Sequence, residues 1–400
     1  MDGIELKYQG KRSESEIISL VSDVKKIKLG KNPTYINGDN LIVMSSLLAS
    51  GYNNSVDLIY IDPPYNTNQV FSVDNDRVST ISRNGSVVAY SDNLRPSEYL
   101  EFIRERLILM RELLSAKGSI YLHIDCKMGH YVKLIMDEVF GAENFLNDIA
   151  RIKSNPKNFK RPAYGNQRDM VLFYAKNRGK NIFNNITRSL TEEEIISKFK
   201  KIDKNGRHYN TVPVHAPGET KSGETGGYWR DMLPPKGRHW RTNPEELDKL
   251  DSEGLIEWSK NGVPRIKKYA DEHKGKKIQD ICIYIDPAYP LYPTEKNLDM
   301  LKMIVLQSSN SDSLVMDCFA GSGSTLLAAE QAGRKWIGID QSDYSAEVIK
   351  ERFRKVDFDY IKFSDIEDDL NKEQAIKALR ANKLFNPPAS ITRSSIVGEQ

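Results

Sequence analysis

The stretch VMDCFAGSGSTLLAAEQAGRKWIGID, residues 315–340, contains a strand, a glycine turn, a helix and a second strand in succession. Its first apolar run ends at Asp317, Gly321 and Gly323 form the turn, and the second run ends at Asp340. A helix that connects two consecutive buried strands returns the chain so that the strands lie parallel. This stretch therefore predicts an α/β fold.

The same alternation of strands and helices extends over most of the chain. An apolar strand, VDLIYID, precedes a segment whose periodicity predicts a helix over 97–116. A strand over 117–125 and a helix over 129–141 come next, and a helix over 297–308 leads into the glycine-turn stretch. We expect one parallel sheet with helical crossovers.

The middle of the chain interrupts this alternation with short apolar pieces separated by Gly and Pro. Residues 151–280 carry 28 Lys and Arg against 17 Asp and Glu, whereas the rest of the chain carries 30 against 38. Three of the four tryptophans lie in the same basic part. A basic, aromatic insertion predicts a polyanionic partner, most simply nucleic acid, and a solvated lysine-rich surface is the alternative.

The composition is that of an ordinary globular protein, with 39% hydrophobic and 28% charged residues. No apolar run approaches the roughly 20 residues that a membrane helix needs, and the N-terminal residues lack the apolar core of a secretory signal. Three widely spaced cysteines predict neither a disulfide framework nor a metal site. We therefore expect a cytoplasmic protein with no metal ion and no membrane partner.

The glycine turn, FAGSGST at residues 319–325, is typical of a nucleotide-binding turn. Its glycines allow the backbone to approach a ligand closely, and N–H groups at the start of the following helix attract a carboxylate or a phosphate. Asp340 suits the two hydroxyls of a ribose. Leu326 replaces the third glycine of a dinucleotide fingerprint, and no lysine follows Gly323 as in a phosphate loop. The pattern favours S-adenosylmethionine, with a purely structural turn as the alternative.

A second motif, IYIDPPYNTN at residues 59–68, places polar groups at the end of a buried strand. Methyl transfer to an exocyclic amine requires that the nitrogen lone pair be released from conjugation with the ring. Asp62 and the carbonyl of Pro63 can accept hydrogen bonds from the two N–H groups of such an amine, and Pro64 stiffens the turn. Tyr65 can stack on a base extruded from the duplex. We expect Asp62 to be the catalytic acid.

The sequence nearly repeats this motif as IYIDPAYPLY at residues 283–292. The second copy keeps the aspartate, Asp286, and the tyrosine, but has alanine in place of the second proline. No helix and strand follow it as they follow Asp62. We interpret Asp286 as a structural turn residue and predict that its substitution by alanine leaves most of the methylation.

Together these motifs resemble the β-type amino-group DNA methyltransferases. The matching segments are DPPYNT at 62–67, DCFAGSGST at 317–325, GRKWIGID at 333–340, INGDN around Asp39 and YPTEKN at 292–297. The resemblance covers most of residues 34–355. The segments EFIRERLILMRELLSAKGSIYLHID and MDEVFGAENF are similar to the methylating subunits of type III restriction systems.

The resemblance implies a Rossmann-like S-adenosylmethionine-dependent methyltransferase sheet with a permuted motif order, in which the catalytic motif precedes the cofactor motif. It implies site-specific methylation of adenine N6 in double-stranded DNA, by base flipping and direct transfer. The implied catalytic residues are Asp62, Pro63, Pro64 and Tyr65. The implied cofactor-binding residues are Asp39, Thr294, Lys296, Asp317, Phe319, Ala320, Gly321, Gly323 and Asp340. Asn297 replaces the proline that the family usually has after the lysine, which bears on the contacts around Lys296.

The predicted domain organisation follows from this motif order. The parts are an N-terminal extension (1–33), a catalytic half (34–150), an inserted basic target-recognition domain (151–290), a cofactor-binding half (291–360), and a C-terminal helix and tail (361–400). Two segments are candidates for DNA contact. The loop 66–95 can close over a flipped base, with a long surface excursion as the alternative. PPKGRHWR at 234–241 can face DNA, with packing of Trp240 as the alternative.

Other functions remain open at this point. Methylation of cytosine N4 uses the same amine chemistry, and an RNA methyltransferase or a catalytically inactive DNA-binding subunit are further alternatives. The aspartate before the two prolines favours adenine, the large basic insertion suits a DNA duplex, and the intact motifs argue against an inactive subunit. The resemblance also suggests a restriction subunit and a homodimer, although no residue of the sequence demonstrates either partner.

Overall fold

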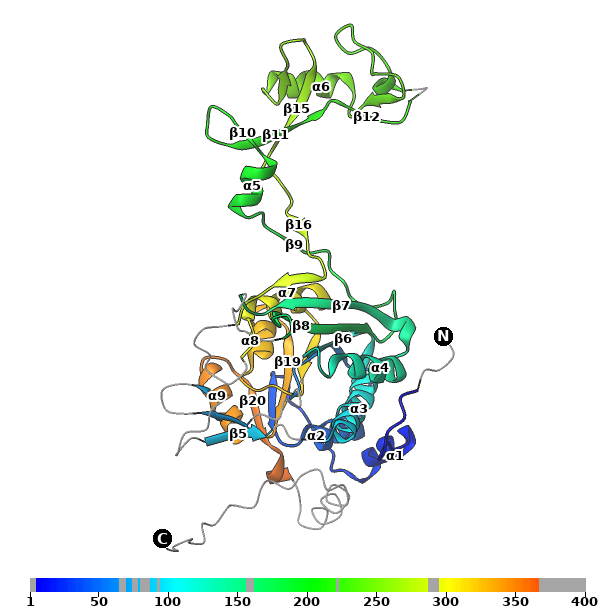
Figure 1. Ribbon diagram of the computed structural model, residues 1–400, viewed down its shortest axis with the longest axis vertical. Helices are drawn as coiled ribbons and strands as arrows, with labels where there is room; N and C mark the ends of the chain where they lie inside the picture. The colour runs from blue at the N-terminus through cyan, green and yellow to red at the C-terminus, as the bar shows by residue number, and fades with distance from the viewer. Residues whose placement is uncertain are drawn as a thin grey trace, which may run out of the picture. The chain divides into compact units, whose positions relative to one another are not determined.

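The computed structural model describes residues 5–64, 70–73, 78–79, 87–91, 94–155, 162–220, 223–286 and 295–366. Most of the predicted C-terminal helix and tail, residues 367–400, lies outside them. The chain forms two compact units, of which the first combines Met1–Asn185 with Gln279–Gln400 and the second is Ile186–Ile278 (Figure 1). No helix among the described residues is both long and apolar enough to cross a membrane.

A nine-stranded sheet forms the centre of the first unit, in the order β17-β7-β8-β6-β2-β18-β19-β1-β20. Its strands are β1 (Thr34–Asn37), β2 (Val56–Ile61), β6 (Leu114–Ile124), β7 (Phe145–Ile152), β8 (Arg168–Ala175), β17 (Ile281–Ile283), β18 (Leu314–Asp317), β19 (Lys335–Asp340) and β20 (Asp359–Lys362). Neighbouring strands in this order are parallel, except that β8 runs against β6 and β7. The predicted α/β fold is confirmed.

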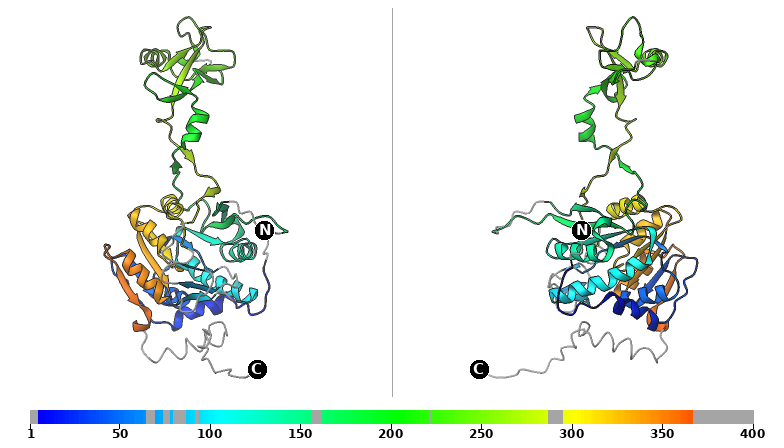
Figure 2. Two further views of the ribbon diagram at one scale, coloured as in Figure 1. Left: turned by 60° about the vertical axis from the view of Figure 1, so that its left-hand side comes forward. Right: turned by 90° about the vertical axis from the view of Figure 1, so that its right-hand side faces the viewer.

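Helices cover both faces of this sheet (Figure 2). On one face Ile59 of β2 shares a hydrophobic core with Leu107 of the covering helices, and on the other Tyr121 of β6 hydrogen-bonds to Ser308 at 2.7 Å. The first layer is α2 (Asn40–Ala49), α3 (Pro96–Leu113) and α4 (Gly129–Phe140); the second is α7 (Leu298–Ser308), α8 (Ser324–Gln331) and α9 (Asp343–Arg352). Alternate residues of each strand therefore face opposite helical layers, as expected of a largely parallel sheet.

Two elements differ from the sequence-based expectation. Helix α3 ends at Leu113 and not at residue 116, because Leu114 pairs with Val56 and starts β6. Within 66–95, expected as a loop, the described residues 70–73, 78–79 and 87–91 are strands, because Val, Phe and Tyr favour extended backbone. They form a small antiparallel sheet of β4 (Val78–Ser79), β3 (Val70–Val73) and β5 (Val87–Ser91).

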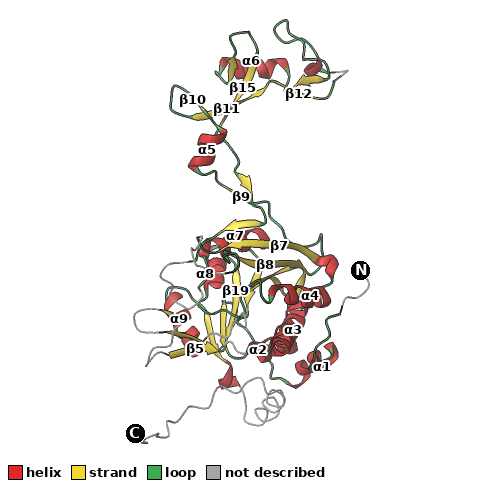
Figure 3. Cartoon of the chain, viewed as in Figure 1, coloured by secondary structure: helices red, strands yellow, loops and turns green. Residues whose placement is uncertain are grey.

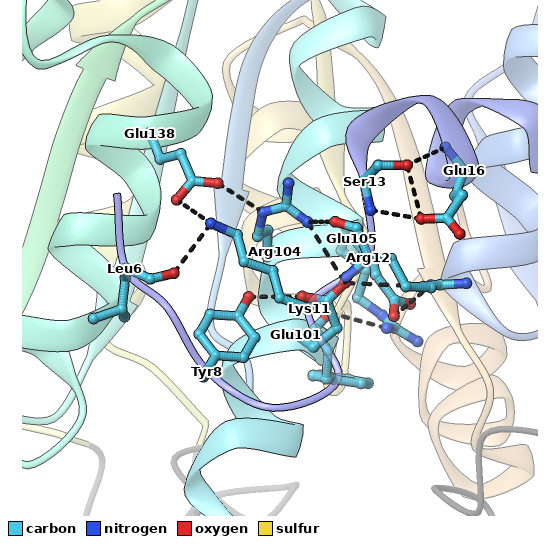
Figure 4. Close-up of polar contacts among 12 residues, drawn as sticks. Leu6, Tyr8, Lys11, Arg12, Ser13, Glu16, Glu101, Arg104, Glu105 and Glu138 are labelled. Carbon is cyan, nitrogen blue, oxygen red and sulfur yellow. Dashed lines mark hydrogen bonds and ion pairs between the residues drawn. The ribbon is translucent and has the colours of Figure 1, made fainter. Parts of the chain in front are cut away.

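The N-terminal extension is attached to α3 and α4 by polar side chains (Figure 4). Just before α1 (Glu14–Ser19), the ammonium group of Lys11 donates to Glu138 of α4 at 2.8 Å. The hydroxyl of Tyr8 donates to Glu101 of α3 at 2.6 Å. These contacts hold the N-terminal extension against helices α3 and α4.

The described residues of the second unit form short strands, the helices α5 and α6, and a 3₁₀ turn at Glu224–Gly226 (Figure 3). Its elements are β9 (Thr187–Arg188), α5 (Glu192–Lys198), β10 (Lys201–Ile202), β11 (His208–Pro213), β12 (His215–Pro217), β13 (Arg238–Trp240), α6 (Pro244–Ser252), β14 (Ile256–Trp258), β15 (Pro264–Tyr269) and β16 (Lys276–Lys277). Trp229 and Trp240 are buried in its small core with Leu247. For Trp240 the packing alternative is therefore confirmed.

The second unit is narrower than the predicted target-recognition domain, 151–290. Residues 151–185 belong to the first unit, because β8 pairs with β6 and β7 in the central sheet. The basic residues of 151–180 therefore lie in the first unit, and the second unit carries only 19 Lys and Arg against 15 Asp and Glu. Its role in target recognition stays a prediction.

Candidate active site

Three neighbouring strands of the central sheet deliver aspartates to the same edge. Asp62 directly follows β2, Asp317 ends β18, and Asp340 ends β19. The chain continues from β2 to β6 on one side and from β18 to β19 on the other, so β2 and β18 flank a topological switch point. In open α/β sheets, ligands bind outside the carboxyl ends of the strands at such a point.

A cavity of about 320 Å³ lies at this edge of the sheet. Its walls come from β2, α3, the turn after β18 and the end of β19. Nine predicted site residues line it: Asp39, Asp62, Pro64, Lys296, Asp317, Phe319, Ala320, Gly321 and Asp340. The fold thus brings together residues from both predicted halves of the methyltransferase domain, although the role of each residue stays a prediction.

The glycine turn and Asp340 are held together by direct hydrogen bonds. Gly321 and Gly323 have φ angles of 49° and 75°, in the left-handed region that favours glycine. Gly323 is the N-cap of α8, and a Cβ there would lie 2.2 Å from Cδ1 of Ile349. The backbone N–H of Gly321 donates to Oδ2 of Asp340 at 2.8 Å, and that of Ser342 donates to Oδ1 at 2.9 Å.

Burial raises the pKa of two carboxyl groups in the cavity. Desolvation raises the pKa of Asp317 to about 7, against hydrogen bonds from Thr325 and from the backbone N–H of Phe319. Desolvation also raises the pKa of Asp340, against two backbone hydrogen bonds. Burial thus disfavours the charged forms of Asp317 and Asp340, and a cation bound beside them would oppose that effect.

Asp62 lies at the carboxyl end of β2, beside the switch point, and its side chain is 17% exposed. Its Oδ2 lies 2.5 Å from Nζ of Lys296, and its Oδ1 lies 4.0 Å from Nδ1 of His123. Pro63 is buried next to it, and Pro64 lines the cavity. Asp62 therefore forms an ion pair with Lys296 and lies beside the buried His123, beyond hydrogen-bond distance of it.

Two other predicted residues, Tyr65 and Thr294, lie outside the described residues. The segment that carries Lys296 is anchored by the residue after it. Oδ1 of Asn297 accepts hydrogen bonds from the backbone N–H groups of Asp299 and Met300 at 3.0 and 3.2 Å. Asparagine is a favoured N-cap, so the departure from proline at this position supplies a cap for α7.

The cavity also contains residues that the sequence motifs do not indicate. Arg106 and Phe102 reach it from α3, with the guanidinium carbon 3.7 Å from the ring centroid. Nε of Arg106 donates to Oδ1 of Asn40 at 2.6 Å, and Nη2 lies 3.6 Å from Oδ2 of Asp39. Desolvation lowers the pKa of Arg106, and the nearby carboxylates oppose this. The only signal in the sequence is a charged residue on the apolar side of a helix.

Comparison with known proteins places this geometry in a family. The profile of a DNA methylase family matches residues 56–351. The chain is 41% identical over 366 residues to the type II methyltransferase M.EcaI of Enterobacter cloacae, covering 88% of this chain and 77% of that protein. The chain belongs to the DNA methylase family.

Two more distant relatives of this DNA methylase are a subunit of a restriction-modification enzyme and an adenine methyltransferase. One is the StyLTI Mod subunit of a type III restriction-modification enzyme from Salmonella typhimurium, 28% identical over 366 residues, which cover 82% of this chain and 55% of that subunit. Another is the DNA adenine methyltransferase YhdJ of Escherichia coli, 24% identical over 324 residues, which cover 81% of this chain and 82% of that protein. The predicted DNA methyltransferase activity, with S-adenosyl-L-methionine as methyl donor, is confirmed at the level of the family.

Proposed function

We propose that this DNA methylase transfers its methyl group to N6 of adenine at a specific site in double-stranded DNA, and that Asp62 holds the target amine. The observation that carries the proposal is the position of Asp62. It follows the central strand β2 and lines the same cavity as Gly321 and Asp340. Direct transfer requires the donor and the acceptor to be held in one place and in the correct orientation.

The charge of the cavity fits S-adenosyl-L-methionine. The carboxylates in the lining are Asp39, Asp62, Glu295, Asp317 and Asp340, and the cationic side chains are Arg106 and Lys296. When bound, S-adenosyl-L-methionine supplies a methyl group on a positively charged sulfonium. We assign Asp340 to the ribose hydroxyls, the turn at Gly321 to close backbone contact, and Asp39 with Arg106 to the charged amino-acid end.

In this proposal Asp62 and the carbonyl of Pro63 accept the two N–H groups of the target amine. The two hydrogen bonds turn the nitrogen lone pair out of conjugation with the ring and toward the methyl group. Lys296, 2.5 Å from Asp62, offsets the charge of the carboxylate. The base must leave the duplex to reach such a cavity. Stacking of the base on Tyr65 stays a prediction, because that residue lies outside the described part of the chain.

Two observations favour adenine as the target base. The residue before the two prolines is an aspartate, Asp62, and the relative YhdJ is named a DNA adenine methyltransferase. Cytosine also carries an exocyclic amine that the same pair of acceptors can hold. Methylation of cytosine N4 is therefore the second candidate.

The second unit, Ile186–Ile278, is our candidate for recognition of the DNA sequence. Lys236 in the turn before β13 and Arg238 at its first residue are exposed, and His239 next to Arg238 is half-buried. Lys and Arg side chains contact phosphates and can also read guanine in the major groove. The resemblance to a Mod subunit further supports a restriction subunit as a partner, and we include a homodimer as a proposal that size measurement in solution can test.

The proposal is tested by identifying the product. The purified chain is incubated with methyl-labelled S-adenosyl-L-methionine and DNA of diverse sequence, and the digested nucleosides are separated and identified by mass spectrometry. We expect label in N6-methyldeoxyadenosine. Label in N4-methyldeoxycytidine alone would refute the adenine assignment, and no labelled nucleoside from any DNA would refute the proposed reaction.

A further inference from the structure

A row of polar side chains crosses five adjacent strands of the central sheet, beginning beside Asp62. It lies on the face covered by α7, because Tyr60 and Tyr121 are register partners and Tyr121 contacts Ser308 of that helix. The polar row consists of Tyr60 on β2, His123 on β6, Asp169 on β8, Arg151 on β7 and Asp286 after β17.

Each member of the polar row contacts the next. The hydroxyl of Tyr60 lies 2.8 Å from Nδ1 of His123, and Nε2 of His123 lies 3.3 Å from Oδ2 of Asp169. Nη1 of Arg151 lies 3.6 Å from the same carboxylate, and Nη2 forms an ion pair with Asp286. The row therefore connects the environment of Asp62 with Asp286 in the second of the two IDPxY segments, where the first is Ile61–Tyr65 and the second is Ile285–Tyr289.

Apart from Asp286, the members of the row are buried in positions where apolar side chains would pack at a lower cost in free energy. Tyr60, His123, Asp169 and Arg151 are at most 2% exposed. On the same face two residues along, Tyr121 stacks on the ring of Phe173 with their centroids 4.1 Å apart, as an ordinary sheet core does. Burying charged groups costs free energy unless they are paired and hydrogen-bonded, and apolar replacements of such groups often stabilise a protein. Stability alone thus gives no reason for a polar row at this position.

The hydrogen-bond partners define the state of the histidine. Burial lowers the pKa of His123, while the hydrogen bond to Asp169 and the charge of Asp62 raise it and Lys296 lowers it. The carboxylate of Asp169 can only accept, so Nε2 of His123 carries the proton and donates to it. Nδ1 of the neutral ring then accepts a hydrogen bond from the hydroxyl of Tyr60. Burial also raises the pKa of Tyr60, so its hydroxyl keeps that proton.

We propose that His123 is a positioning residue for methyl transfer. Asp169 fixes the ring of His123 through Nε2, and the Nδ1 side of the ring fixes Tyr60 and lies 4.0 Å from Oδ1 of Asp62. Lys296 pairs with Oδ2 of Asp62. The fixed ring of His123 is too far from Oδ1 to form a hydrogen bond, but it occupies the space on that side and so restricts rotation of the carboxylate. This inference rests on the proposed role of Asp62.

A matched pair of substitutions tests the inference. Tyr60→Phe and Tyr121→Phe remove the same hydroxyl from two buried tyrosines that are register partners, one bonded to His123 and the other to Ser308. We expect Tyr60→Phe to reduce the single-turnover rate of methyl transfer at least about tenfold at saturating S-adenosyl-L-methionine and DNA, because small losses of orientation are costly in rate. Tyr121→Phe should leave that rate within about twofold, and both should keep the dissociation constant for S-adenosyl-L-methionine.

A second pair of substitutions, His123→Gln and His123→Asn, distinguishes the contacts of the two ring nitrogens of His123. The amide of His123→Gln can reach the position of Nε2 and donate to Asp169 but leaves no acceptor at Nδ1, whereas the shorter His123→Asn reaches only the Nδ1 side. If Nδ1 matters through Tyr60 and Asp62, His123→Asn should retain more of the single-turnover rate than His123→Gln. Folding of each variant is checked by thermal unfolding, and the conclusion stands on the tyrosine pair if a histidine variant does not fold.

The outcomes are distinct. Equal rates for Tyr60→Phe and Tyr121→Phe, with normal ligand binding, would overturn the positioning role and assign the row to packing. The variant Asp62→Ala is measured in the same assay. Full activity of Asp62→Ala would refute the proposed function itself, whereas its loss together with unchanged Tyr60→Phe would refute only the inference about His123.

Discussion

The two IDPxY segments have similar sequences but different surroundings. The first ends β2, a strand between β6 and β18 whose six residues, Val56–Ile61, are all buried. The second ends β17, which is the edge strand of the sheet, where Ile281 and Ile283 are 67% and 72% exposed. Asp62 therefore opens into a cavity at the switch point, whereas Asp286 follows a strand with one neighbour.

This difference shows that the neighbours of a motif decide what it can do. The side chain of Asp62 is 17% exposed and faces Lys296, with Asp317 and Asp340 in the same cavity. The side chain of Asp286 is 40% exposed, and its ion pair is with Arg151. A carboxylate needs a bound substrate beside it to do chemistry, and of the two aspartates Asp62, not Asp286, lines the cavity at the switch point.

The largest effect is expected from the first copy. Asp62→Ala should reduce the rate constant for methyl transfer by about 10³-fold or more, because it removes the acceptor that orients the amine. The rate is measured in a single turnover with labelled S-adenosyl-L-methionine, and equilibrium binding of the donor serves as the control. If Asp62→Ala keeps more than a tenth of the rate, the chemistry lies elsewhere.

A smaller effect is expected from Arg106, which lines the same cavity as Asp62. Arg106→Leu should raise the dissociation constant for S-adenosyl-L-methionine about tenfold or more, because the guanidinium holds Asn40 and lies beside Asp39. Binding is measured by isothermal titration.

Arg104→Leu is the matched control for this prediction. Arg104 is on the same helix and 5% exposed, but it pairs with Glu138 and Glu101 and does not line the cavity. It should lower the melting temperature without weakening donor binding. Equal weakening by both substitutions would show that α3 acts only through stability.

Much of the fold could be predicted from the sequence because its signals are local. The turn residues Gly321 and Gly323, the acids that end β18 and β19, and the alternation of strands and helices all depend on neighbours in the chain. The same locality explains the errors. Helix α3 ends at Leu113 because Leu114 pairs with Val56 of β2, more than fifty residues earlier in the chain. The helical periodicity of the sequence contains no information about such a long-range pairing.

The part of the site that the sequence did not predict comes from long-range packing. Arg106 belongs to a helix whose pattern indicates only a buried face, and it reaches Asp39 because α2 and α3 share one layer. His123 stands in an apolar strand, and its partners Tyr60 and Asp169 come from two different neighbours. Such contacts depend on strand order and register, which are properties of the assembled sheet.

The most direct test of the central claim compares the two copies in one experiment. Single-turnover methyl transfer is measured for Asp62→Ala and Asp286→Ala, each saturated with S-adenosyl-L-methionine and DNA. The account predicts that Asp286→Ala stays within about threefold of the unchanged protein, since Asp286 does not line the cavity and Arg151 keeps its contacts with Asp169 and the carbonyl of Tyr284. It predicts that Asp62→Ala is lower by a factor of about 10³. Equal losses in the two variants, or a larger loss in Asp286→Ala, would contradict it.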